Sequence, residues 1–355
     1  MNYLPTVINI ETVNRYCNAR CPMCTIKFSP EYSNVSKDEF SHNGILRKAE
    51  IMTLDNFKII IDKFKSIAGN ITALNLHGCG EPLLDKSLAD KVKYAKISGF
   101  TNVGFSSNCD ILTRETTESL LDSGLNCLIA SIDGLSKDVQ EKIRPRTDCK
   151  KIYDNVKYFI EYRDKNKLPC RVLPRMVRQQ LNMGEWDAYK EYWENILSLD
   201  KGDEVLFMDV HNTGGKVEGY DEMKVDGYDL KVDSFHQKKV EESDLVKLLK
   251  KDKDKDKDKD SVFLKVNDAE RARLCPDLFS RMNIFASGDV ALCAADQSGY
   301  YKLGNIIDGD VEEIFNSDIV KEYRNKWLNN QEDQLKYCNG CTITVSRFNK
   351  TYKTI

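Results

Sequence analysis

The sequence lacks any hydrophobic run close to the roughly 20 consecutive apolar residues that a membrane-spanning helix needs. It also lacks a charged N-terminus followed by an apolar stretch, the pattern of a secretory signal peptide. Positive charge is not in excess, because 53 Lys and Arg stand against 56 Asp and Glu. We therefore expect a soluble cytoplasmic protein with neither a membrane nor a nucleic acid as its partner.

Cysteine, in contrast, is abundant, with 12 among 355 residues. Thiols stay reduced in the cytoplasm, which favours metal or cluster ligation over a disulfide framework. Two groups stand out: Cys17, Cys21 and Cys24, and then Cys275, Cys293, Cys338 and Cys341. The other cysteines, expected mostly as small hydrophobic residues, are Cys79, Cys109, Cys127, Cys149 and Cys170.

Short β-rich runs alternate with amphipathic helical patterns up to about residue 212. The expected strands cover 6–13, 71–77, 101–107, 126–132, 170–177 and 204–211. The expected helices cover 54–68, 85–99, 113–124, 151–165 and 184–197. This alternation predicts an α/β fold with a parallel sheet and right-handed crossovers. Six repeats suit an open, partial (β/α)6 TIM-like barrel better than a closed eightfold one.

The rest of the chain has a different character. Residues 213–265 are polar and include the repeat KDKDKDKDKD at 251–260, which we expect to be a solvated linker. Residues 266–355 predict a small α+β domain, with two strands in 282–293, a Gly-Asn turn in YYKLGNI and a helix over 310–328. The predicted domains are therefore 1–212, 213–265 and 266–355.

The first cysteine group has the spacing Cys17-x3-Cys21-x2-Cys24 and follows the first expected strand directly. It therefore belongs at the carboxyl end of that strand, where parallel barrels carry their chemistry. Three thiolates can hold three irons of a four-iron cluster and leave the fourth iron open. A zinc ion is the alternative; it would want a fourth protein ligand at short range, and His42 is the nearest histidine in sequence.

Three further segments follow the next expected strands in order. HGCGEPLLD (77–85) contains Gly78, Gly80 and Glu81. SSNCDILT (106–113) contains Asn108, and SIDGLSKDVQEKIRP (131–145) contains Ser131 and Arg144. Each residue has an ordinary structural alternative: the glycines could shape a turn, Asn108 could begin a helix, and Arg144 could lie on the surface.

With the cysteine motif, these segments resemble the radical S-adenosylmethionine (radical SAM) superfamily over roughly residues 5–212. The first resembles the Gly-Gly-Glu segment that reaches the SAM amino group, and the second a Thr-Asn-Gly turn in which Cys109 replaces the glycine. Ser131 and Arg144 match residues that contact the SAM ribose or carboxylate.

This resemblance implies a [4Fe-4S] cluster that chelates SAM and, once reduced, cleaves it to methionine and a 5′-deoxyadenosyl radical. The radical abstracts a hydrogen atom from the substrate. The electron would come from a flavodoxin-like or ferredoxin-like donor.

The second group has the spacing Cys275-x17-Cys293-x44-Cys338-x2-Cys341. Four thiolates can saturate either a second cluster or a structural zinc ion. The surrounding sequence resembles the SPASM extension of radical SAM enzymes in its shortened "twitch" form. That form holds one auxiliary [4Fe-4S] cluster, with no open iron, for electron transfer or structure.

A saturated auxiliary cluster can accept an electron from a substrate radical, and twitch-type relatives include dehydrogenases of aminocyclitols. We therefore expect oxidation of a small, polar, carbohydrate-like molecule. The alternatives are a radical epimerase with Cys79 or Cys109 as hydrogen donor, a peptide-modifying maturase, and a non-catalytic iron–sulfur or zinc scaffold. The 16 residues before Cys17 offer little room for a peptide-leader domain, which weighs against the maturase.

Substrate contacts are expected near the ends of the last two barrel strands. Arg175, Arg178 and Gln179 could face the pocket, and Asp209 and His211 are candidates for a base. Salt-bridged arginines and a hydrogen-bonded core histidine are equally good interpretations.

Overall fold

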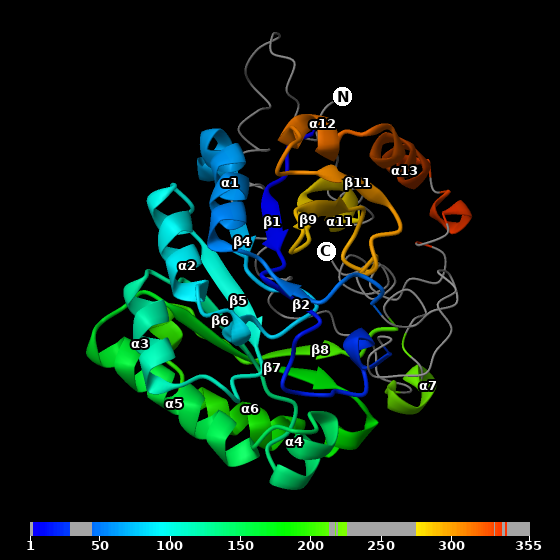
Figure 1. The fold of residues 1–355 in the computed structure, drawn as a ribbon. Coiled ribbons are helices and arrows are strands. Elements are labelled where there is room, and N and C mark those ends of the chain that lie inside the picture. Colours follow the sequence, from blue (N-terminus) through cyan, green and yellow to red (C-terminus); the bar gives the residue numbers. More distant parts are fainter. Residues whose placement is uncertain are drawn as a thin grey trace, which may run out of the picture.

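The structure, a computed structural model, describes residues 3–28, 45–212, 217, 219–225, 275–329, 331–335 and 338. Within these residues one sheet has the strand order β11-β10-β9-β1-β4-β5-β6-β7-β8 (Figure 1). Its parallel barrel strands are β1 (Val7–Ile10), β4 (Ala73–Asn75), β5 (Val103–Ser107), β6 (Cys127–Ser131), β7 (Arg171–Arg178) and β8 (Leu206–Asp209). Because β8 ends the sheet instead of pairing with β1, the predicted open, six-stranded barrel is confirmed.

Helices follow the barrel strands and cover one face of the sheet (Figure 1). They are α1 (Leu54–Phe64), α2 (Leu88–Ile97), α3 (Arg114–Asp122), α4 (Lys137–Ile143), α5 (Cys149–Lys165) and α6 (Trp186–Glu194), with the short α7 (Tyr220–Met223) beyond β8. Oxygen side chains fix several starts by accepting a first-turn N–H, as Thr53, Thr113, Ser136 and Asp148 do. Short 3-10 helices lie at Thr25–Phe28, Lys65–Asn70, Pro82–Leu84, Gln180–Glu185, Leu199–Lys201 and Glu332–Gln334.

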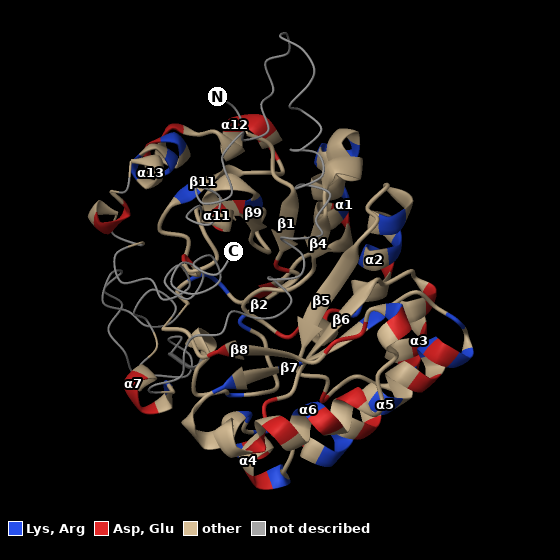
Figure 2. Ribbon diagram, turned by 180° about the vertical axis from the view of Figure 1, so that it is seen from behind, with Lys and Arg blue, Asp and Glu red and all other residues tan. Residues whose placement is uncertain are grey.

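The two faces of the sheet differ in polarity. Alternate strand residues, including Ile8, Leu74, Phe105 and Leu128, point to the helices and form the main apolar core. On the opposite face a small apolar cluster of Cys127, Leu173 and Leu206, packed against Ile129, lies near the starts of the strands. Figure 2 shows Lys, Arg, Asp and Glu side by side on the outer helices, whereas the strands are mostly uncharged.

Each expected strand and helix of the barrel is confirmed, mostly with shorter bounds. The run 6–13 divides into β1 and β2 (Val13–Asn14), and β2 pairs antiparallel with β3 (Glu50–Ile51). The expected helix 54–68 ends as a 3-10 turn from residue 65. Helix α4 was not expected, because its segment was interpreted only as a motif.

The C-terminal region joins the same sheet. It contributes β9 (Arg281–Ile284), β10 (Asp289–Ala291), β11 (Lys302–Asn305), α11 (Pro276–Phe279), α12 (Val311–Phe315) and α13 (Asp318–Leu328). β9 pairs parallel to β1, on the side away from β4, and β10 and β11 continue antiparallel from it. A small α+β unit is confirmed, although its strands extend the barrel sheet instead of forming one of their own.

Two local expectations in this region were wrong. The Gly-Asn pair at 304–305 ends β11 instead of making a turn, and a side chain at Gly304 would press on Ile314. The helix expected over 310–328 breaks after α12, because the Asn316 amide donates to the Glu312 carbonyl and also to the Tyr3 carbonyl across the molecule.

The Lys-Asp repeat at 251–260 and nearly all of the expected linker lie outside the described residues, as do His42 and Cys341. The three-domain division therefore stays a prediction. Within the part of the chain that is described, no helix has both the length and the apolarity to cross a bilayer.

One buried ion pair in the barrel, Arg163–Asp203, should make a measurable contribution to the free energy of unfolding. Arg163 of α5 lies 2.6 Å from the Asp203 carboxylate, and both side chains are fully buried. Asp203 also accepts the backbone N–H groups of Val172 and Ser198. We expect Arg163→Met to lower the free energy of unfolding by about 3–5 kcal/mol, because it leaves a buried carboxylate without its cation.

Urea unfolding of the two proteins measures this difference. Lys150→Met is the control, because it breaks an ion pair with Asp154 in which both side chains are exposed, and it should leave the midpoint unchanged. Equal midpoints for wild type and Arg163→Met would contradict the prediction.

Candidate functional site

The first cysteine group lies on a loop between β2 and the 3-10 turn Thr25–Phe28, next to the carboxyl ends of the barrel strands. Cys21 is buried, and Cys17 and Cys24 are half-buried. The Asn108 amide donates to the Asn18 side chain at 2.9 Å and lies 3.9 Å from the Cys17 sulfur. The Arg144 guanidinium lies 3.8 Å from the Cys21 sulfur. The loop is thus held against the turns that follow β5 and β6.

The chemistry of the three thiols suits metal ligands. Burial, with a smaller contribution from Cys24, raises the pKa of Cys17 and of Cys21 to about 12. Such thiols keep their protons until a metal ion displaces them. In the described segments, no three His, Cys, Asp or Glu side chains converge on a point where one metal ion could sit. A four-iron cluster does not need its ligands to converge on one point, since each thiolate binds a different iron.

Gly78 and Gly80 lie in the loop after β4 (residues 78–81), which we name the SAM loop only after the family segment that its sequence resembles. A Cβ at Gly78 would lie 2.7 Å from Glu11, and a Cβ at Gly80 would lie 2.3 Å from the Val13 carbonyl oxygen. Both glycines are therefore required where the SAM loop packs on the chain just ahead of the cysteines. Their structural role is established by this packing.

Glu81, at the end of the SAM loop, is 3% exposed. Its carboxylate accepts hydrogen bonds from the Ser107 hydroxyl at 2.7 Å, the Asn108 N–H at 3.0 Å and the Leu83 N–H at 3.1 Å. Burial raises its pKa, against the effect of these donors. Glu81 therefore ties the SAM loop to the turn after β5.

Cys109 occupies the position where the family turn has glycine. Its φ is +59°, in the left-handed region, which costs a residue with a Cβ on the order of 1 kcal/mol. Its N–H donates to the Ser107 hydroxyl at 2.9 Å, and its thiol is fully buried in the main core. The turn thus keeps a glycine-like backbone, and the Cys109 thiol points away from the site.

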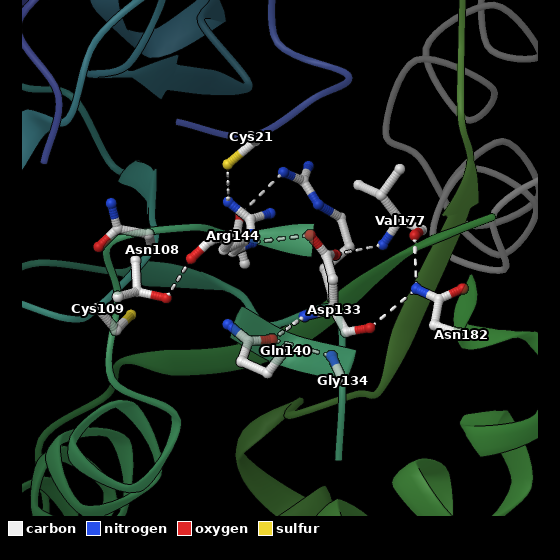
Figure 3. A network of polar contacts seen from close by, with 12 residues as sticks. Cys21, Asn108, Cys109, Asp133, Gly134, Gln140, Arg144, Val177 and Asn182 are labelled. Atoms are coloured by element: carbon white, nitrogen blue, oxygen red, sulfur yellow. Dashed lines mark hydrogen bonds and ion pairs between the residues drawn. The ribbon is translucent and has the colours of Figure 1, made fainter. Parts of the chain in front are cut away.

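Arg144 belongs to a buried network built on Asp133 (Figure 3). Its Nε lies 2.7 Å from the Asp133 carboxylate, which also accepts the Val177 N–H at 2.7 Å. Burial lowers the pKa of Arg144, but Asp133 and Cys21 raise it by more. The Gln140 side chain accepts the N–H groups of Asp133 and Gly134, so α4 holds the turn. Arg144 is thus buried beside the first cysteine loop and is not a surface arginine.

Ser131 lies on the face of the sheet opposite the helices. Its hydroxyl is 2.9 Å from that of Ser106, and Arg175 Nη2 donates to both hydroxyls, at 3.2 and 3.1 Å. His77 Nδ1 accepts the Ser106 N–H. These side chains form a polar patch beyond the apolar cluster on the same face.

A row of amides continues this patch across the sheet. Asn75 donates to Asn9 at 2.8 Å, Asn9 to Asn283 at 2.9 Å, and Asn283 to Asp277 at 3.2 Å. The asparagines are register neighbours on β4, β1 and β9. With Ser106, Ser131, Arg175 and His77 they form what we call the polar wall.

The other expected substrate contacts lie elsewhere. Arg178 is three residues beyond Arg175, so it faces the helices, where it pairs with Asp209 at 2.7 Å and lies over Phe207. Gln179 caps the 3-10 helix Gln180–Glu185. The structure therefore separates Arg178, Gln179 and Asp209 from the polar wall. His211 is half-buried two residues beyond β8.

The second cysteine group gathers beside α13. Cys275 begins α11, Cys293 follows β10, and Cys338 lies after the last 3-10 turn. Cys275 packs in an apolar cluster with α13, and Trp327 Nε1 lies 3.4 Å from the Cys338 sulfur. Burial, then Asp277 and Cys275, raises the pKa of Cys293. Cys341 cannot be placed with them, since it lies outside the described residues.

Two family models match the chain. Residues 12–173 match the radical SAM superfamily, and residues 275–342 match an iron–sulfur cluster-binding domain, SPASM. The chain therefore combines a radical SAM domain over residues 12–173 with a C-terminal SPASM domain over residues 275–342. These domains imply a SAM-binding [4Fe-4S] cluster and an auxiliary iron–sulfur cluster, as expected from the sequence.

The chain is similar to several known proteins. A curated relative, GTP 3′,8-cyclase of Clostridium botulinum (strain Hall), is 30% identical over 147 residues, which is 41% of this chain and only 40% of the cyclase. BtrN in complex with AdoMet and 2-DOIA aligns with a TM-score of 0.53 and 15% identity, over 96% of this chain and 94% of BtrN.

Streptococcus suis SuiB bound to precursor peptide SuiA aligns with a TM-score of 0.59 and 14% identity, over 90% and 67% of the two chains. AdoMet-bound anSMEcpe gives a TM-score of 0.58 and 14% identity, over 98% and 95%. At such identities these structures share the fold alone.

The polar wall also makes a prediction about pH. Burial, then Arg175 and Arg281, lowers the pKa of His77 to about 3. The unfolded chain binds this proton below about pH 6.5, whereas the folded chain does not, so stability is lost as the pH falls from 6.5 toward 3. We expect the stability advantage of wild type over His77→Asn to shrink by about 1–2 kcal/mol between pH 7.5 and pH 5.

Urea unfolding of both proteins at the two pH values tests this, with pH 8.5 as the control, where the difference should equal that at pH 7.5. A difference that stays constant down to pH 5 would show that His77 is protonated equally in both states.

Proposed function

We propose that the chain is a radical SAM dehydrogenase acting on a small, polar, carbohydrate-like or aminocyclitol-like substrate. When bound, the clusters supply the electron that cleaves SAM to the 5′-deoxyadenosyl radical and accept the electron that the substrate gives up. The substrate would lose a hydrogen atom to that radical, then a proton and an electron. The polar wall is the single observation that carries the substrate class.

The wall offers hydrogen-bonding groups in the pattern that a polyhydroxylated ring needs. A primary amide has two donor N–H groups and an oxygen with two lone pairs, and the contacts of Asn9 along the row use only one of each kind. Neighbouring strands hold such groups about 4.8 Å apart. Ser106, Ser131 and Arg175 add hydroxyl and guanidinium groups.

The SAM contacts in this proposal are Gly78, Gly80, Glu81, Asn108, Ser131 and Arg144. Support comes from Asn108 and Arg144, which lie near sulfurs of the first cysteine loop, and from Glu81, which accepts the Asn108 N–H. The cluster ligands would be Cys17, Cys21 and Cys24 for the SAM site, and Cys275, Cys293, Cys338 and Cys341 for the auxiliary site. A flavodoxin-like or ferredoxin-like protein would be the electron donor.

The decisive assay measures 5′-deoxyadenosine formed from SAM by anaerobically reconstituted, dithionite-reduced protein. Cell extract is added as separate small-molecule and macromolecular fractions. We expect the small-molecule fraction to increase the formation of 5′-deoxyadenosine. Stimulation by the macromolecular fraction alone would replace the proposal with a peptide-modifying or protein-modifying enzyme.

Variants of the polar wall test the substrate site itself. Asn75→Ala removes one amide of the row and should reduce the stimulation by the small-molecule fraction about tenfold, since an unmet polar contact costs on the order of 1–3 kcal/mol. Asn102→Ala is the matched control, because its amide donates to the Thr72 carbonyl away from the wall, and stimulation should stay at the wild-type level. Equal stimulation of Asn75→Ala and Asn102→Ala would show that the polar wall is not part of the substrate site.

A further inference from the structure

Glu11 joins three segments that lie far apart in the sequence. It directly follows β1 and is 3% exposed. Its carboxylate receives two hydrogen bonds from Arg47, at 2.7 and 2.9 Å, one from the Cys79 N–H at 3.0 Å and one from the Ala286 N–H at 3.4 Å. Cys79 belongs to the SAM loop, and Ala286 to the turn between β9 and β10.

Arg47 extends this junction to the second cysteine group. Its Nε donates to the Gln297 carbonyl at 2.8 Å, and its guanidinium lies over the Phe285 ring at 3.5 Å. Burial lowers the pKa of Arg47, but Glu11 raises it by more, so Arg47 stays charged. Gln297 lies on the loop that begins at Cys293, here called the auxiliary loop (residues 293–301).

Further contacts hold the auxiliary loop at the same place. The Leu46 N–H donates to the Ser298 hydroxyl, and Thr25, which directly follows Cys24, contacts the Gln297 side chain. Gly299 has φ +71°, and a Cβ there would lie 3.0 Å from Phe285. The auxiliary loop is thus shaped to fit the Arg47 and Phe285 stack.

We propose that Glu11 and Arg47 are positioning residues that fix the auxiliary loop against the SAM loop and so set the spacing of the two cluster sites. Glu11 holds the SAM loop by accepting a hydrogen bond from the Cys79 N–H, and Arg47 holds the auxiliary loop by donating one to the Gln297 carbonyl. The bidentate pair between them transmits any movement of one loop to the other. This inference depends on the two cluster sites and not on which substrate is bound.

Arginine is required for this role by its geometry. A guanidinium presents a rigid fork of donors, so one side chain can hold the Glu11 carboxylate and the Gln297 carbonyl at once. A lysine keeps the charge but offers a single nitrogen. Arg47→Lys therefore retains an ion pair with Glu11 while losing the link between the loops.

Arg178→Lys is the matched control. Arg178 also pairs with a carboxylate, Asp209, at 2.7 Å, and its guanidinium also lies over a phenylalanine ring, Phe207, at 3.8 Å. The two substitutions remove the same kind of interaction, but Arg178 contacts neither loop by these bonds.

The experiment is hydrogen exchange of the full chain, followed by mass spectrometry, both before and after iron–sulfur reconstitution. In Arg47→Lys we expect exchange in the SAM loop and the auxiliary loop to rise together by about tenfold, and in Arg178→Lys to stay at the wild-type rate. Protection unchanged in Arg47→Lys, or lost in only one of the two loops, would overturn the proposal.

A second measurement uses the clusters themselves. In the dithionite-reduced, reconstituted protein, magnetic interaction between the clusters speeds spin relaxation and raises the microwave power needed to saturate the electron paramagnetic resonance signal. We expect Arg47→Lys to saturate at lower power than wild type and Arg178→Lys to match wild type. Identical saturation in all three proteins would overturn the proposal. No substrate is used, so failure of the proposed dehydrogenase activity would leave both results interpretable.

Discussion

The architecture depends on the hydrogen bonding of one short strand, β1, along both of its edges. β4 pairs with it on one side and β9 on the other, so the barrel and the C-terminal hairpin form one continuous sheet. The carboxyl end of β1 leads within a few residues to the first cysteine loop. β9 leads through its hairpin to Cys293. A strand paired on both edges thus brings two cysteine groups, more than 250 positions apart in the chain, to neighbouring parts of one sheet.

The site is then made rigid by charges buried at the strand ends. Glu11, Glu81 and Asp133 each follow a barrel strand, and each carboxylate accepts a backbone N–H from a neighbouring segment. Glu11 and Asp133 also form buried ion pairs, with Arg47 and Arg144. Burying an ion pair gains little stability over well-packed apolar residues. These pairs instead give directional bonds that hold loops in one arrangement, which suits a reaction in which a radical must meet one hydrogen atom.

Much of this was predictable from the sequence. The cysteine spacing and the strand–helix alternation predicted the loop and the sheet, and the resemblance to the radical SAM superfamily singled out residues such as Glu81 and Arg144. Periodicity locates elements well, because an apolar face must repeat with the geometry of the strand or helix. The glycines of the SAM loop were also singled out, although the structure explains them through close contact with Glu11 and Val13.

Other features could not be read from the sequence, because they depend on register and long-range pairing. The amide row exists only because Asn9 pairs in register with both Asn75 and Asn283, and no local pattern marks such alignment. Arg178 and Asp209 were candidates for the pocket, with a salt bridge as the equal alternative, and strand parity turns them to the helices, where they pair with each other. Glu11 and Arg47 were missed, although a carboxylate directly after the first strand was a signal comparable to that of Glu81.

The two ends of the polar wall lie near different cysteine groups. It runs from Asn75 to Asp277, and Asp277 lies close enough to Cys293 to raise the pKa of that thiol. The other end of the wall, Ser131, lies two residues before Asp133, whose carboxylate pairs with Arg144 beside Cys21. The wall therefore extends between the surroundings of the two cysteine groups. In the proposed dehydrogenase, a ring bound on the wall would lie between the residues that would hold the SAM-binding cluster and those that would hold the auxiliary cluster, and the auxiliary cluster would accept the electron that the substrate gives up.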